Sequence, residues 1–367
     1  MLRGPTMSEQ LQGSIQVLVL YDVAEEIRLD ELRRILRVQP PGREPAFKHT
    51  APEYVRFERP PVVEQLGEIK LESGATSAAR IKYFEYGVVS VEFRLSFQGD
   101  WNDLVNLACA HVASAEPGGH AQMLVRRQVE RVKSALVKPY DTWLSEDYYI
   151  FHIVPSDSAC TGPELLSARG DEIAEIVRGE NVKLSDEERR EVLSSTISYY
   201  PTDLAVVGWN AALVFDTAAG AVTTFELLEY ANSQLLEFRH YDDVLTRQLE
   251  SVYQVLEKGT GFLARWRLAR ASERLHAMLL EVTELTERTD NALKFLSDMF
   301  SARLYHLAAN KVGVLDYKTL VNQKLETAED LYSFMVEQFN QSRTFVLEVM
   351  VVIILIIELV MLFRGKS

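Results

Sequence analysis

The segment FVLEVMVVIILIIELVMLF, residues 345–363, is the only run in the 367-residue sequence that is apolar and long enough to span a bilayer as a helix. Seventeen of its nineteen residues are apolar. At about 1.5 Å per residue, this helix matches the roughly 30 Å thickness of bilayer hydrocarbon. The alternative is a helix buried in a soluble core. We expect one C-terminal transmembrane helix, with the rest of the protein on one side of the membrane.

Composition restricts the kinds of partner and the compartment. Acidic residues outnumber basic ones by 53 to 39, which argues against general nucleic-acid binding because that binding needs clustered Lys and Arg. Two cysteines, Cys109 and Cys160, are too few for a disulfide framework or a four-ligand zinc site. Residues 1–13 contain no long apolar stretch of the secretory-signal type. We therefore expect the N-terminal bulk in the cytoplasm and a single C-terminal pass in the inner (cytoplasmic) membrane.

Residues 1–218 have the patterns of an α+β domain. Apolar, β-branched runs predict strands at 15–21 and 147–154, and Asp100 is a typical N-cap for the helix that follows it. The segment 202–217 predicts two strands that turn at Gly208-Trp209-Asn210. The order strand, helix, two strands, helix, strand resembles a ferredoxin-like unit. The other expected elements are a helix at 29–36, a hairpin or one bent strand at 79–97, and helices at 100–112, 121–136, 164–177 and 186–199.

Residues 219–344 contain no proline and no strand pattern. Apolar residues recur there at spacings of three and four in three series, 228–256, 278–310 and 321–342, and Gly259-Thr260-Gly261 separates the first two. Positions that flank these series are also often apolar. We therefore expect a long antiparallel helical or coiled-coil stalk, built as a three-helix bundle or an oligomer of hairpins, before the transmembrane helix at 345–363.

Asp242 interrupts the first apolar series of the stalk. A carboxylate on a helix seam lowers stability unless it is paired, and such residues tend to fix register or partner. Arg239, three residues earlier, is the nearest candidate partner in the sequence. We interpret the pair as an alignment device for the bundle, with a role in an active site as the alternative.

Arg303 and His306 make the end of the second series polar. If the first two helices pair antiparallel about their glycine break, these residues approach Glu226 and Glu229. The simpler interpretation is a polar end of the bundle that docks the α+β domain. The alternative is a site that depends on a proton or a metal ion.

Two groups of residues point to the membrane and to self-association. Arg265, Arg267 and Arg270 are interleaved with apolar residues and Trp266, a pattern typical of contact with an anionic membrane surface. The alternative is that this helix tilts away and the arginines stay solvated. Glu358 lies within the apolar C-terminal run, where an ionised, lipid-facing carboxylate costs about 2–3 kcal/mol. We expect Glu358 to face a helix of another copy or a partner, unless the helix slides until this residue reaches the interface.

The segments EYANSQLLEFRHYDDVLTRQL (229–249) and ETAEDLYSFMVEQFNQSRTFVLEVMVVIILIIELVMLF (326–363) carry a resemblance to a known family. They resemble proteins of unknown biochemical function that include the mitochondrial "required for meiotic nuclear division" proteins and their bacterial relatives. That resemblance implies an α/β region, long helices and a C-terminal membrane helix with a late Glu, here Glu358. It also implies a membrane-anchored, oligomer-forming protein. The mitochondrial relatives support translation at the inner membrane. It transfers no catalytic residue to this sequence.

Motifs for catalysis are missing from the sequence. It has no Gly-rich phosphate loop of either common spacing, no HExxH, no GxSxG and no paired CxxC. We therefore assign no catalytic, cofactor-binding or metal residue, and we expect no enzyme. The expected function is a membrane-anchored, homo-oligomeric scaffold that displays its α+β domain to a protein partner.

Two other classes of function stay open. An ion channel or transporter of the magnesium-transporter type also places an α/β domain and long helices before its membrane helices. That class needs two membrane helices and a Gly-Met-Asn signature, and the sequence lacks both. An enzyme with an unrecognised site in the N-terminal domain ranks lower, because no motif supports it.

Overall fold

The computed structural model describes residues 10–38, 60–70, 76–113, 116–156, 160–257, 270, 272–280, 282–284 and 299–364. The chain divides into two compact units. The first contains Met1–His240 and Arg288–Lys318, and the second contains Tyr241–Glu287 and Thr319–Ser367. Two long helices, α6 (Ala221–Glu257) and α9 (Val314–Arg364), contribute residues to both units.

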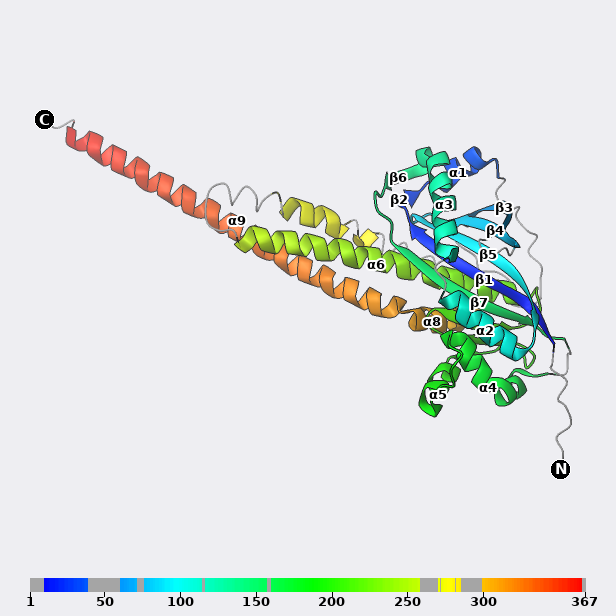
Figure 1. Cartoon of the computed structure of the whole chain (residues 1–367). Coiled ribbons are helices and arrows are strands. Elements are labelled where there is room, and N and C mark those ends of the chain that lie inside the picture. The colour runs from blue at the N-terminus through cyan, green and yellow to red at the C-terminus, as the bar shows by residue number, and fades with distance from the viewer. Residues whose placement is uncertain are drawn as a thin grey trace, which may run out of the picture. The chain divides into compact units, whose positions relative to one another are not determined.

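The first unit contains a mixed eight-stranded sheet in the order β3-β4-β5-β1-β7-β10-β9-β8 (Figure 1). Neighbouring strands are antiparallel except β7 and β10, which are parallel. A second, two-stranded sheet pairs β2 with β6. The strands are β1 (Leu11–Asp22), β2 (Ala24–Ile27), β3 (Val62–Lys70), β4 (Thr76–Tyr83), β5 (Val88–Gly99), β6 (Leu136–Pro139), β7 (Ser145–Val154), β8 (Thr196–Ile197), β9 (Leu204–Val207) and β10 (Ala211–Phe215).

The sheet confirms the predicted α+β class but not the ferredoxin-like arrangement. A ferredoxin-like unit contains a split βαβ crossover, so its first strand has a parallel neighbour. Here β1 pairs antiparallel with β5 on one side and with β7 on the other. The ferredoxin-like topology is therefore wrong, because β4 and β5 form a hairpin whose second strand runs against β1.

One face of this sheet carries the main apolar core. Val17, Val19 and Tyr21 of β1 alternate onto this face, where they join Leu104 of α2 and Ile173 of α4 in a single cluster. Side-chain caps fix where these helices begin: Asp100 caps α2, as the sequence predicts, and Thr161 caps α4. The helices that belong to this part of the chain are α1 (Leu29–Leu36), α2 (Trp101–Val112), α3 (Glu116–Arg131), the 3-10 turn η1 (Lys133–Ala135), α4 (Gly162–Arg178) and α5 (Asp186–Ser194).

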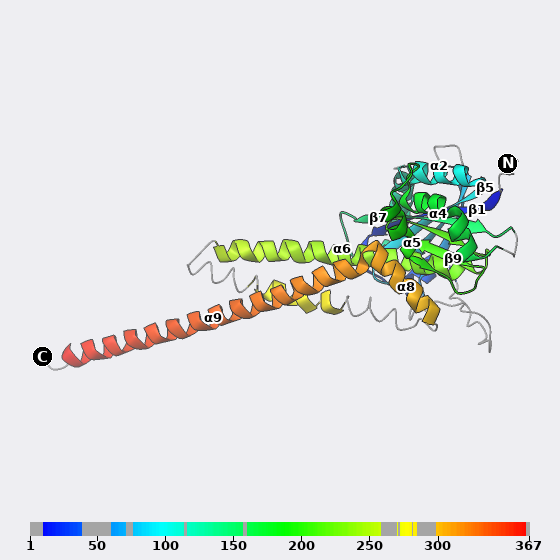
Figure 2. The same ribbon diagram turned by 90° about the horizontal axis from the view of Figure 1, so that it is seen from below.

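The opposite face of the sheet is covered by the first half of α6. Residues 227–238 of α6 are all buried, so the helix has no solvent-facing side over three turns. The helix α8 (Met299–Val312) lies beside this half of α6 (Figures 1 and 2), where Tyr305 donates a hydrogen bond to Gln234. The first half of α6 is thus an interior helix, packed between the sheet and α8.

In the second unit, apolar residues that recur in the sequence at spacings of three and four are buried between helices. Leu245 and Leu249 of α6 are buried, and so are Val321 and Ala328 of α9. The segment between them contributes further buried residues, which are Leu275, Met278, Leu279 and Val282. These positions confirm that helices follow the α+β domain and that their spacing of three and four marks their packed faces.

The structure does not support the predicted transmembrane helix. The segment 345–363 lies within α9, but no helix in the described part of the chain is both long and apolar enough to cross a membrane. The side chains of residues 338–349 lie outside this description.

Two glycines with positive φ provide a direct test of the fold. Gly87, in the turn between β4 and β5, has φ +93°, and a Cβ atom there would lie 1.7 Å from the carbonyl oxygen of Ala24. Gly67 has φ +79°, at the bulge in β3, and a Cβ atom there would meet nothing within 4 Å. Gly67→Ala should lower the free energy of unfolding by about 1–2 kcal/mol through backbone strain alone. Gly87→Ala should lose about 1–3 kcal/mol more from the clash, measured by urea denaturation. Equal losses for the two variants would contradict this packing of the β4–β5 turn.

Candidate functional site: a buried polar seam under helix α6

The register of the sheet gathers charged residues on the face that α6 covers. Glu92 of β5 lies between Leu18 of β1 and Arg80 of β4. Two residues further along β1, Leu20 lies opposite Glu146 of β7. Because side chains alternate between the two faces, these residues all point toward α6. We call the resulting set the polar seam, and it consists of Asp22, Arg80, Lys82, Glu92, Glu146, Glu229, Ser233, Arg239 and His240.

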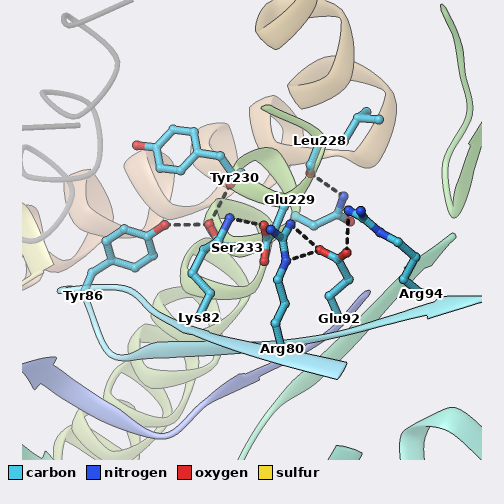
Figure 3. Close-up of polar contacts among 10 residues, drawn as sticks. Arg80, Lys82, Tyr86, Glu92, Arg94, Leu228, Glu229, Tyr230 and Ser233 are labelled. Carbon is cyan, nitrogen blue, oxygen red and sulfur yellow. Dashed lines mark hydrogen bonds and ion pairs between the residues drawn. The ribbon is translucent and has the colours of Figure 1, made fainter. Parts of the chain in front are cut away.

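The centre of the polar seam is an ion pair between Lys82 of β4 and Glu229 of α6 (Figure 3). Both residues are buried, Lys82 at 5% exposure and Glu229 at 2%. Beside this pair, Glu92 accepts hydrogen bonds from Arg80 and, at 3.1 Å, from Arg94. Three cations and two carboxylates therefore meet where the sheet contacts α6.

Burial and neighbouring charges act in opposite directions on Glu229. Burial by itself would raise the pKa of its carboxyl, but the charges of Lys82 and Arg80 and the hydrogen bonds outweigh it and lower the pKa. Burial raises the pKa of Glu226, where the nearby Glu229 adds to the effect and the two cations oppose it. Glu229 is thus the anionic partner of Lys82.

A chain of tyrosine contacts runs beside the ion pair. The Tyr86 hydroxyl lies 2.6 Å from Ser233 Oγ, which in turn donates to the Tyr230 carbonyl at 2.7 Å (Figure 3). The Tyr230 hydroxyl accepts from Gln234 at 2.9 Å, and Gln234 accepts from Tyr305 of α8. Hydrogen bonds therefore connect the β4–β5 turn through α6 to α8.

The polar seam ends at a second pair of contacts with α6. Arg239 forms an ion pair with Glu146, and His240 Nδ1 lies 2.7 Å from Asp22 Oδ2. The His240 ring stacks on Tyr140 at a centroid distance of 4.5 Å. Burial raises the pKa of Asp22 against the hydrogen bond and charge of His240, and burial likewise raises the pKa of Glu146 against Arg239. Residues 229–240 of α6 are thus held to the sheet over about three turns.

This arrangement is suited to alignment. Its charges are paired with one another, and no group of three metal-ligating side chains occurs in the part of the chain that the structure describes. Breaking a buried pair by removing one partner costs about 3–5 kcal/mol, although an intact pair stabilises little relative to an apolar one. Sliding α6 by one turn would separate every pair, so the polar seam selects a single position for this helix.

The structure gives Asp242 and Arg239 separate partners. Arg239 pairs with Glu146 of β7, whereas Asp242 Oδ1 lies 2.5 Å from Lys324 Nζ of α9. Lys324 also donates to the hydroxyl of Thr246, one turn along α6. The predicted pairing of Asp242 with Arg239 is therefore wrong, because Arg239 is directed toward the sheet. Asp242 does lie in a helix–helix ion pair, and its role in setting oligomer size or partner stays a prediction.

Arg303 and His306 lie on the exposed side of α8. The Arg303 guanidinium lies 5.9 Å from the Phe300 ring centroid, and the His306 ring makes an edge contact with Tyr305. The expected approach of Arg303 and His306 to Glu226 and Glu229 is wrong, because α8 buries a different side of the helix, next to the one that carries Arg303 and His306. The buried residues of α8 are Ser301, Leu304, Tyr305, Ala308, Ala309 and Val312.

The remaining predicted residues concern the membrane. Glu358 is exposed on α9, and Arg270 is exposed as well. Arg265, Trp266 and Arg267 lie outside the described residues. Their contact with an anionic membrane surface therefore stays a prediction.

Sequence reasoning missed the polar seam itself. One signal was available: Arg80, Lys82, Ser90, Glu92 and Arg94 occupy alternate positions in two strands, and the residues between them, Ile81, Val91 and Phe93, are apolar. A period of two places all of them on one face of the sheet. The partner Glu229 lies 147 residues after Lys82, and nothing local in the sequence pairs them.

The fold and the polar seam define a class of protein, an α+β domain that is locked to the first of several long helices. Residues 12–222 match the family model described as "Uncharacterized protein MJ0711, N-terminal domain", which is more than half of the chain. The chain therefore belongs to this family. The matched residues contain the sheet from the second residue of β1 onward and end at the start of α6.

One relative is similar to about half of the chain. "Uncharacterized protein MJ0711" of Methanocaldococcus jannaschii is 20% identical over 189 residues, which is 52% of this chain and 58% of the relative. The match thus spans less than two thirds of the relative's length. No solved structure matches the chain. These findings confirm an uncharacterised family, and the resemblance to the "required for meiotic nuclear division" proteins stays a prediction.

A double-mutant cycle tests the central ion pair of the polar seam. Lys82→Met leaves Glu229 buried without its nearest cation and should lower the free energy of unfolding by about 3–5 kcal/mol. Lys82→Met combined with Glu229→Leu should lose less than Lys82→Met alone, because no unpaired charge is then left at the centre. Urea denaturation followed by tryptophan fluorescence measures both.

The matched control for this cycle is Arg247→Met. Its partner Asp243 is exposed, so the loss should stay within about 0.5 kcal/mol. If the double variant lost as much as the sum of its two single variants, Lys82 and Glu229 would not act as a pair.

Proposed function

We propose that the chain is a membrane-anchored interaction protein that displays its α+β domain through long helices. The observation that carries this proposal is the exposed apolar end of α9. Eight consecutive residues, 350–357, are apolar, and each is between 50% and 57% exposed. Eight residues make more than two helical turns, so this part of α9 is apolar on every side.

An exposed helix that is apolar on all sides needs cover from outside the chain. Contiguous exposed apolar surface of this kind marks sites of protein or membrane contact. The sequence extends the apolar run to 345–363, which is about 28 Å of helix and close to the bilayer hydrocarbon thickness. Lipid is the cover that we propose, with the α+β domain on the cytoplasmic side of the inner membrane.

Glu358 supports self-association as part of this proposal. It follows directly after the exposed apolar residues and is itself exposed. An ionised carboxylate facing lipid at this depth would cost about 2–3 kcal/mol. Contact with the same helix of a second copy removes Glu358 from lipid, so we propose a homo-oligomer.

In this proposal, a protein partner binds to the α+β domain. The ionic groups of the polar seam are buried or half-buried and are paired, which suits a rigid platform better than a catalytic site. The contact with an anionic membrane surface through Arg265, Trp266, Arg267 and Arg270 belongs to the same proposal.

Membrane extraction of the full chain tests the proposed anchor. The unmodified protein should stay in the membrane pellet after alkaline carbonate washing and enter solution only with detergent. Ile353→Lys combined with Ile356→Lys should release it, because two charges in the apolar run cost about 5–7 kcal/mol in lipid. The matched control, Leu320→Lys with Val336→Lys, changes two exposed apolar residues of the same helix and should leave the protein in the pellet.

The detergent extract also tests self-association. It should contain particles with more than one chain, and Glu358→Leu should reduce their size. Release of the unmodified protein by carbonate would contradict the anchor, and particles of one chain would contradict the oligomer.

A further inference from the structure

A pocket of about 240 Å³ lies in the first unit, at the end of the sheet where α6 begins. Its floor is formed by apolar side chains of β9 and β10, among them Leu204 and Val214. Its walls come from the loop before β9, from the loop between β10 and α6, and from α8. The residues that carry the argument are Tyr199, Tyr200, Asp203, Asp216, Gly220 and Phe300.

Three aromatic rings stand at steep angles to one another in the wall. The Tyr199 and Tyr200 rings are 4.6 Å apart with an interplanar angle of 85°. The Tyr199 and Phe300 rings are 5.0 Å apart at 69°. At these distances the rings are in edge-to-face contact, so they form one continuous aromatic wall against which a compact group can lie. The face of an aromatic ring attracts cations through its quadrupole.

Two carboxylates supply negative charge to the same pocket. Asp203 accepts hydrogen bonds from the backbone amides of Tyr199 and Tyr200, at 2.8 Å each, and so fixes the loop that carries both rings. Asp216 Oδ1 accepts from the Thr217 amide at 2.6 Å. Asp216 Oδ2 makes no hydrogen bond to the residues that the structure describes. Burial raises the pKa of Asp216 against the Thr217 bond, and the charge of Asp203 adds to this rise, so a cation in the pocket would be favoured.

The residue Gly220 leaves room beside Asp216. A Cβ atom at this position would lie 2.4 Å from Asp216 Oδ2. Glycine therefore keeps this oxygen accessible at the wall of the pocket.

The charge of the lining selects the sign of the ligand. Asp203 and Asp216 are the charged residues among the described residues that line the pocket. A cation described beside this lining is Arg303, whose guanidinium lies 5.9 Å from the Phe300 ring centroid. An anion at the start of α6 would face both carboxylates. A metal ion would find two carboxylates, and no group of three metal-ligating side chains occurs among the described residues. An organic cation fits both the rings and the charge.

We propose that this pocket binds a small organic cation that carries a quaternary ammonium group. The ammonium lies against the rings of Tyr199, Tyr200 and Phe300, with Asp216 as its counter-ion. The volume is below the range of about 300–1,000 Å³ that is usual for drug-sized ligands, so the ligand has few non-hydrogen atoms. This inference is independent of the membrane anchor, because every lining residue lies in the first unit.

Calorimetric titration of the full chain in detergent, with choline as the probe, tests the proposal. Its neutral isostere, 3,3-dimethyl-1-butanol, has the same shape without the charge. Choline should bind with a millimolar or lower Kd, and the neutral isostere should bind at least about tenfold more weakly, because attraction to the rings and carboxylates needs the charge. Equal affinity for both compounds, or no heat of binding with choline up to about 100 mM, would overturn the proposal.

Substitutions in the pocket test whether choline binds there. Asp216→Asn and Phe300→Ala should each weaken choline binding by about tenfold or more. The matched control is Asp141→Asn, an exposed carboxylate outside the pocket, which should leave the affinity unchanged. If choline bound equally well to both pocket variants, the pocket would be excluded as its site. The comparison of choline with its isostere uses the unmodified protein, so a variant that fails to fold does not affect it.

Discussion

The ion pair between Lys82 and Glu229 is the constraint on which the arrangement of the first unit depends. It places a cation of β4 and a carboxylate of α6 together in a position closed to water. Such a pair is intolerant of a shift, because an unpaired charge in the interior costs about 3–5 kcal/mol. Further along α6, the contacts of Arg239 with Glu146 and of His240 with Asp22 also fix the position of the helix on the sheet. One face of the sheet is therefore held by apolar packing, and the other by apolar packing together with the ion pairs of the polar seam.

Parts of this fold follow from local patterns in the sequence. The strand at 15–21, the Asp100 cap and the hairpin that turns at Gly208 depend on neighbours in the chain, and all three occur in the structure. Leu245 and Leu249 of α6 and Val321 of α9 also follow a local pattern: residues spaced by three and four lie on one side of a helix, and these three are buried. Local periodicity thus identifies elements and their packed sides.

The sequence could not supply the contacts between distant segments. The partner of Asp242 is Lys324, 82 residues away, although Arg239 is nearer in the chain. The direction of β5 against β1 depends on a hairpin, which periodicity does not distinguish from a crossover. On α8, Arg303 and His306 lie on the side of the helix next to the one that is buried. Periodicity alone does not show which of two adjacent sides of a helix packs against the rest of the protein. The pocket near Asp216 likewise joins residues from β8, β9, β10, α6 and α8 and from two loops.

Hydrogen exchange of the backbone amides tests most directly whether α6 is an integral part of the first unit. The comparison is between residues 228–238 of α6 and residues 15–21 of β1, measured in the same sample under native conditions. If the polar seam locks α6 to the sheet, both sets of amides should exchange only through global unfolding of the unit, with the same free energy of opening. Exchange of the α6 amides through a separate opening of lower free energy, while those of β1 stay protected, would contradict this account.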